Sequence, residues 1–254
     1  MAPKKPCPTC PNRRWPMPCW IASVSGSVKS DFSMQKALSE TDRFKILTAV
    51  RQSLELLRTL GIDTLESAPD TLEQIQADVQ ACNRCCLREQ TPQPVCGEGT
   101  SQARLVFITG FPVAPDLEIG RPLQGPAGEL FTKMIGAMGL DRAAVYVIPL
   151  LKCGPGDTRA AAETAAACCR SFLDRQLSVI APECICIFGE FAASLLLNTR
   201  EPLAHIRGKF HTYNTITALA TWDPDTLLRN PALKRDAWQD LQAIMACLGL
   251  NRPT

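Results

Sequence analysis

Apolar and β-branched residues gather into four short runs after residue 104 of the chain. Stretches with helical spacing of apolar residues lie between or after these runs, at 127–138, 160–180, 190–197 and 232–248. Alternating strands and helices are typical of a parallel sheet that is covered on both faces. The pattern therefore predicts an α/β fold, a three-layer α/β/α sandwich with a four-stranded parallel sheet. Its predicted strands are Leu105–Ile108, Val145–Leu151, Cys184–Phe188 and Thr215–Ala220.

The region before the predicted sheet has a helical pattern instead. Leu47, Val50, Leu54 and Leu57 recur at helical spacing, and a second short helix is expected to run from near residue 70 to residue 82. We expect these helices to pack on the main domain. The alternative is that they serve a protein partner.

Residues 1–33 are rich in Pro, Lys, Arg and Ser and lack any periodicity, so we expect a disordered tail. Cys7, Cys10 and Cys19 within it also suit part of a metal site, although no His and no fourth ligand lie nearby. The expected organisation is a tail at 1–33, a helical extension at 34–80 and the main domain at 81–250.

Composition and charge exclude several classes of protein. The chain has 254 residues, of which 46% are hydrophobic and 20% charged, as in ordinary globular proteins. A net charge of +2 argues against a polybasic nucleic-acid binder, so any DNA contact must come from a local patch. No apolar run approaches a membrane span, and no signal peptide is evident. We expect a cytoplasmic monomer without membrane contact.

Thirteen cysteines is a high number for this length, and an odd number in a chain without secretion signals favours metal ligands or buried thiols over disulfides. Cys82 and Cys85 form a C-x-x-C pair, Cys153 follows the second predicted strand, and Cys169 lies in the next predicted helix. Four thiolates in this arrangement suit either zinc or a [4Fe–4S] cluster, and spacing alone does not separate the two.

The segment Thr221–Pro231, T-W-D-P-D-T-L-L-R-N-P, follows the last predicted strand. Pro224 and Pro231 bracket it, which predicts a stiff loop. Leu227, Leu228 and Arg229 lie at its tip. Two explanations compete, because leucines here either fold back onto the core or form an apolar wedge that separates bases beside a phosphate-binding arginine.

This segment resembles the T-x-H-P-x-x-L-L-R-N-P loop of the iron–sulfur uracil-DNA glycosylases, the family-four branch of that superfamily. Further motifs in the same order are similar to the family's. They are V-C-G-E-G-T-S-Q-A-R-L-V-F-I, G-R-P-L-Q-G-P-A-G-E-L, I-F-G-E-F-A-A, I-R-G-K and N-P-A-L-K-R. The resemblance implies a uracil-DNA glycosylase-like fold and DNA, single- or double-stranded, as the partner.

The resemblance also favours iron over zinc. It implies a [4Fe–4S] cluster whose ligands are Cys82, Cys85, Cys153 and Cys169. Cys86 and Cys168 stand beside these positions as spare thiols or substitute ligands.

The positions that carry the family's chemistry are substituted. Phe111 replaces the acidic residue of the G-E-A-P-G motif, and the spacing from there to the G-R-P motif is one residue short. Leu123 replaces the Phe that stacks on uracil, Pro149 replaces the Asn that reads its edge, and Asp223 replaces the catalytic His. Asp116 and Glu118 in the remodelled segment could position water, but we expect a solvated acidic loop.

No catalytic residue of the family is therefore intact, whereas Leu228 and Arg229 match its DNA-facing wedge. We expect an iron–sulfur, DNA-binding protein with lost or strongly reduced uracil excision. The alternatives are an active glycosylase in base-excision repair with a rebuilt site, for uracil or another damaged base, and a redox or interaction protein that uses the cluster. Local positive charge for DNA is expected from Arg121, Lys152, Arg159 and Arg207.

Overall fold

The computed structural model describes residues 48–49, 51–52, 70–91, 93–154 and 158–250. The chain divides into two compact units, residues 1–70 and residues 71–254. The expected tail at 1–33 lies outside the described residues. In the first predicted helix only residues 48–49 and 51–52 are described, and they are helical.

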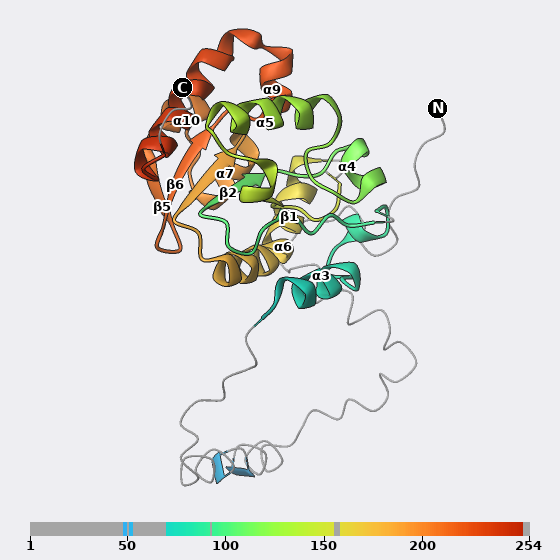
Figure 1. Ribbon diagram of the computed structural model, residues 1–254. Helices are drawn as coiled ribbons and strands as arrows, with labels where there is room; N and C mark the ends of the chain where they lie inside the picture. The colour runs from blue at the N-terminus through green and yellow to red at the C-terminus, as the bar shows by residue number, and fades with distance from the viewer. Residues whose placement is uncertain (1–47, 50, 53–69, 92, 155–157, 251–254) are drawn as a thin grey trace, which may run out of the picture. The chain divides into compact units, whose positions relative to one another are not determined.

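A six-stranded mixed sheet forms the centre of the second unit within the described residues (Figure 1). Its strands lie in the order β1-β3-β2-β4-β6-β5, and the four in the middle are parallel. The bounds are β1 Glu98–Gly99, β2 Leu105–Thr109, β3 Tyr146–Pro149, β4 Cys184–Phe188, β5 Phe210–Tyr213 and β6 Ile216–Thr221.

Helices cover both faces of the sheet because alternate strand residues point to opposite faces. On one face, Val106, Ile185 and Ala218 pack against α6, α7 and α8. On the other, Phe107 and Leu219 pack against α5 and α10. The bounds are α5 Gly125–Ala137, α6 Arg159–Ile180, α7 Glu190–Leu196, α8 Leu203–Ile206 and α10 Lys234–Cys247. The predicted three-layer α/β/α architecture is confirmed.

The prediction of four strands was incomplete. β1 and β5 join the edges of the parallel core as short antiparallel strands. β1 has two residues and β5 is mostly polar or exposed, so neither has the buried apolar run by which the central strands were predicted. The full sheet is therefore mixed, with a parallel centre.

Two short helices replace segments that were expected to be loops. α9, Pro224–Arg229, occupies the centre of the supposed stiff loop after β6. Proline at the first helical position after an Asp N-cap is a helix start, which the bracketing prolines obscured. α4, Ala114–Ile119, follows β2 in the remodelled segment.

Before the sheet, α3, Leu72–Gln80, packs against α6 and buries Ile75 and Val79. Three 3₁₀ turns complete the described elements, η2 Cys86–Arg88, η3 Arg142–Ala144 and η4 Pro231–Leu233. None of the described helices is long and apolar enough to cross a membrane.

Candidate functional site

A pocket of about 630 Å³ opens at the carboxyl ends of the parallel strands. Thr109 at the end of β2, Phe188 at the end of β4 and the segment after β6 all line it. Open α/β sheets commonly bind ligands at this edge, where the loops after the strands meet. Six candidate site residues singled out from the sequence line the pocket together, namely Phe111, Asp116, Leu123, Asp223, Leu228 and Arg229.

Asp223 lies at the start of α9 and is held there by its own helix. Its Oδ1 accepts a hydrogen bond from the backbone N–H of Thr226 at 2.9 Å, and its Oδ2 accepts one from the Thr226 hydroxyl at 2.8 Å. Gly189 packs against it so closely that a Cβ there would lie 3.0 Å from Oδ2. The carboxylate is thus an N-cap, and it presents acceptors at the pocket wall.

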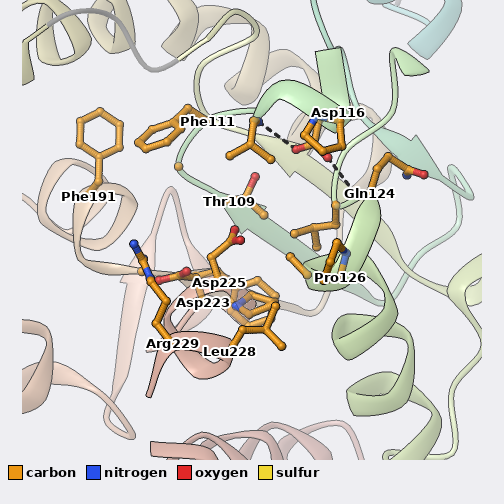
Figure 2. Close-up of a pocket in the computed structure, with 18 of the residues that line it drawn as sticks. Thr109, Phe111, Asp116, Gln124, Pro126, Phe191, Asp223, Asp225, Leu228 and Arg229 are labelled. Atoms are coloured by element: carbon orange, nitrogen blue, oxygen red, sulfur yellow. Dashed lines mark hydrogen bonds between the residues drawn. The ribbon is translucent and has the colours of Figure 1, made fainter. Parts of the chain in front are cut away.

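The two leucines of α9 have different environments. Leu227 is only 1% exposed and belongs to the core, whereas Leu228 is 41% exposed and lines the pocket beside Arg229. Leu227 therefore folds back onto the core, as one explanation predicted, and Leu228 is exposed at the pocket, as the wedge explanation requires. Figure 2 shows Leu228 and Arg229 together at the pocket, with Asp223 and Asp225 next to them.

Asp116 holds the remodelled segment together. Its Oδ2 accepts from the backbone N–H of Val113 at 3.1 Å, and its Oδ1 from that of Gln124 at 2.7 Å (Figure 2). The side chain is buried at 4% exposure, and this burial raises its pKa. The expectation of a solvated acidic loop was therefore wrong for Asp116, although Glu118 is exposed. Hydrogen bonds from the backbone N–H groups of Val113 and Gln124 compensate the desolvation of the Asp116 carboxylate.

Two phenylalanines border the pocket on another side. The rings of Phe111 and Phe191, the latter in α7, lie edge to face with centroids 5.7 Å apart. Figure 2 shows them side by side at the pocket. Such an aromatic pair provides apolar contact area where a carboxylate was replaced.

Three separate segments bring the four cysteines of the predicted metal site to one region. Cys82 follows α3, Cys85 precedes η2, Cys153 follows β3, and Cys169 lies in α6. Burial, together with the nearby Cys169 and Cys153, raises the pKa of the Cys85 thiol to about 12. Burial and Cys169 likewise raise the pKa of Cys153 to about 11, with Cys82 adding to the effect. Thiolates this close repel one another unless a cation binds them.

Within the described ranges, no three Cys, His, Asp or Glu side chains converge as closely as the ligands of a metal ion do. The donor set nevertheless fits an iron–sulfur cluster in number and chemistry, since four thiols from three segments are neighbours. Cys86 and Cys168 lie in the same region, because Cys168 is affected electrostatically by Cys169, Cys82 and Cys86.

Lys152, expected at a DNA-facing surface, is instead buried at 2% exposure. Its ammonium donates to the carbonyls of Cys96 and Pro149 at 2.9 and 3.0 Å and to Oε1 of Gln176 at 2.7 Å. Burial lowers its pKa to about 8. The side chain braces the segments around Cys153 and is not available to phosphates. The other three expected cations pair with carboxylates, Arg121 with Glu98, Arg159 with Glu163 and Arg207 with Asp240.

Comparison with known proteins gives the family of this chain. Residues 96–242 match the model of the uracil DNA glycosylase superfamily. The chain belongs to this superfamily.

Its curated relatives include three type-4 uracil-DNA glycosylases. The chain is 32% identical over 188 residues to that of Saccharolobus solfataricus, covering 70% of this chain and 87% of the relative. It is 28% identical over 193 residues to that of Archaeoglobus fulgidus, covering 73% and 97%. It is 30% identical over 184 residues to that of Sulfurisphaera tokodaii, covering 69% and 84%.

Three of the four positions that the motifs predict to be substituted relative to the iron–sulfur uracil-DNA glycosylases meet at the pocket. Phe111, Leu123 and Asp223 line it. Pro149 does not belong to its lining; it ends β3 and pairs with Thr109, which does. Leu123 adopts a positive φ of 53°, a conformation uncommon outside Gly, and packs mostly into the core.

Several pocket residues were missed from the sequence. Glu190 and Phe191 begin α7, and Asp225 is the second residue of α9. The only signal was position, because residues just after a buried strand in a parallel sheet lie at the ligand-binding edge. They lie within the motifs I-F-G-E-F-A-A and T-W-D-P-D-T-L-L-R-N-P, but neither motif marked them as pocket residues.

The capping role of Asp223 predicts a stability change that is separate from any chemistry. Asp223→Ala should lower the free energy of unfolding by about 1 kcal/mol, because the N-terminal N–H groups of α9 lose their acceptor. Asp223→Ser, which keeps a capping oxygen, is the matched control and should lose less. Urea unfolding of the three proteins measures the difference. An unchanged midpoint for Asp223→Ala would contradict the capping role.

Proposed function

We propose that this chain is an iron–sulfur, DNA-binding member of the uracil-DNA glycosylase superfamily with lost or strongly reduced uracil excision. The observation that carries the proposal is Asp223. Where the resembled family has a His that donates to the leaving uracil, this chain has a carboxylate whose two oxygens accept hydrogen bonds from Thr226. An ionised carboxylate has acceptors only and no proton to donate.

The size of this effect favours loss of the reaction. Uracil leaves as an anion, and removing one preorganised donor to such a developing charge costs about 2.7–4 kcal/mol. A carboxylate at 4 Å from the developing charge opposes it by about 4 kcal/mol more at an effective dielectric constant of 20. Both effects raise the free energy of the transition state for uracil release.

The other substitutions act in the same direction. Leu123 has no aromatic face to stack on the base, and Pro149 has no side-chain amide to read it. Because residue 111 is Phe, the pocket lacks the acidic residue of the first motif. The Phe111 ring packs on Phe191 instead. Groups that act as a unit do not contribute additively, so restoring one of them is expected to restore little.

DNA binding rests on α9, with Leu228 as the apolar wedge and Arg229 as the phosphate contact. Both side chains are exposed. Arg229→Ala should weaken binding to all sequences similarly and reduce the slope of log affinity against log salt by about 0.7–0.9. Leu228→Ala should weaken binding mainly where a base must be displaced from a duplex.

Fluorescence anisotropy with single- and double-stranded oligonucleotides at several salt concentrations tests this. Arg104→Ala is the matched control, since Arg104 directly precedes β2, at the amino end of the strand, and pairs with Glu183. Unchanged affinity in both α9 variants would contradict the proposed interface.

We also propose that Cys82, Cys85, Cys153 and Cys169 hold a [4Fe–4S] cluster, with zinc as the alternative occupant. When bound, such a cluster joins three segments of the chain through its thiolate ligands and stabilises the fold. The residues themselves supply the thiolates, while Lys152 braces the backbone before Cys153 through the Pro149 carbonyl and Oε1 of Gln176.

A second candidate function is an active glycosylase with a rebuilt site, and Asp116 is the observation that favours it. It is a buried carboxylate at the pocket, fixed by two backbone N–H groups. A carboxylate so placed could orient a water molecule. Base release from oligonucleotides that carry single damaged bases distinguishes the two, because only the rebuilt enzyme releases a base.

A further inference from the structure

The pocket carries an excess of negative charge. Among its lining residues, four have carboxyl groups, Asp116, Glu190, Asp223 and Asp225, and one has a guanidinium, Arg229. A pocket for neutral uracil gains nothing from this excess, and one that releases an anionic base is opposed by it.

Asp225 and Glu190 are the carboxylates left to meet a ligand, and Asp225 is the more buried of the two. Asp116 and Asp223 are both engaged by hydrogen bonds from their own loops. Asp225 is half-buried and receives no hydrogen bond from the described part of the chain, although Arg229 acts on it electrostatically. Burial raises the pKa of Asp225, and the charge of Asp223 adds to the rise. A positively charged ligand beside Asp225 would offset both its desolvation and its repulsion by Asp223.

The apolar side of the pocket suits the same partner. Phe111 and Phe191 place aromatic rings beside the acidic wall. Aromatic faces attract cations, and they also stack on flat rings. The volume of about 630 Å³ lies within the range of small-molecule sites and excludes neither a purine nor a pyrimidine.

From the carboxylates, the aromatic pair and the cavity we infer that the base received by this pocket is an N-alkylated base with a positive charge. The inference rests on the proposed function, in which DNA binds at α9 and a nucleotide leaves the stack. It concerns recognition alone and requires no bond to break. Bases of this class are electron-poor and planar, and they pair badly, which lowers the energy needed to displace them from a duplex.

The test compares two methylcytosines that are isomers as neutral bases but differ in charge in solution, because only one of them binds an additional proton. Single-stranded oligonucleotides carrying one 3-methylcytosine, which is cationic, or one 5-methylcytosine, which is neutral, are titrated with the full chain and followed by fluorescence anisotropy. The cationic isomer should bind about tenfold more tightly. Asp225→Asn should reduce the preference to below about threefold. Glu118→Gln, on α4 but outside the pocket lining, is the matched control and should keep it.

Each outcome has a distinct meaning. Equal affinity for the two isomers, together with normal binding of unmodified DNA, overturns this inference and leaves the proposed function intact. Failure to bind any oligonucleotide contradicts both. A tenfold preference that Asp225→Asn leaves unchanged overturns the assignment to this pocket. The isomer comparison uses the wild-type chain, so it holds even if the variant does not fold.

Discussion

Serine at any one of Cys82, Cys85, Cys153 or Cys169 is expected to bleach the protein and to cost more than about 4 kcal/mol of stability. Loss of a metal site is among the few single changes with effects this large, because ligand binding is coupled to folding. The four cysteines lie in three segments of the chain, so losing the cluster releases all three at once. Anaerobically purified protein should be brown and contain about four irons per chain.

Absorbance, iron and sulfide content, and thermal unfolding of each variant measure this effect. Cys247→Ser is the matched control, since Cys247 is exposed at the end of α10. Cys86→Ser and Cys168→Ser should keep the colour if those thiols are spare. A colourless wild-type protein with one zinc per chain would overturn the cluster assignment, and bleaching by Cys86→Ser or Cys168→Ser would change the ligand set.

Asp223→His alone is expected to leave uracil excision below detection. The substitution returns a donor to α9, but Leu123 still offers no ring, Pro149 still offers no amide, and Phe111 still occupies the place of the acidic residue. Each missing donor or positioning group lowers the rate by about 10²–10³-fold. Restoring only one of several groups that act together restores little of the rate. The variant also loses the N-cap, which costs about 1 kcal/mol of stability.

The combined variant with all four positions changed to the family residues is the informative comparison. Asp116 fixes the first segment through Val113 and Gln124, and the motif spacing predicts that this segment is one residue shorter than the family's, so we expect the combined variant to keep a different backbone there. We expect at most weak excision from it. Strong excision by Asp223→His alone would show that the remaining pocket was intact, and would contradict this reasoning.

The sheet core followed from the sequence because its four central strands are buried on both faces and so appear as continuous apolar runs. The edge strands β1 and β5 could not be predicted from the sequence, because they are defined by the strand they pair with rather than by their own composition. α9 carried its own start signal in Asp223 and Pro224, and it was missed because prolines at both ends also suit a loop.

The site was only partly predictable for a related reason. Substitutions at Phe111, Leu123, Pro149 and Asp223 were visible in the motifs, but their surroundings were not. The burial of Lys152 depends on groups distant in the chain, Cys96 and Gln176, and Asp116 is held by the local backbone at Val113 and Gln124. Asp225 and Phe191 lie within quoted motifs that assigned them no role, and only the meeting of three strand ends placed them in the pocket.

Uracil release under single-turnover conditions tests the central claim most directly. Excess protein is incubated near neutral pH with single- and double-stranded oligonucleotides that contain one uracil, beside the type-4 enzyme of Archaeoglobus fulgidus as the active reference. The proposal predicts binding of both oligonucleotides without detectable uracil release by this chain. Release at a rate near that of the reference, abolished by Asp223→Ala, would contradict it and show that Asp223 acts as a catalytic acid.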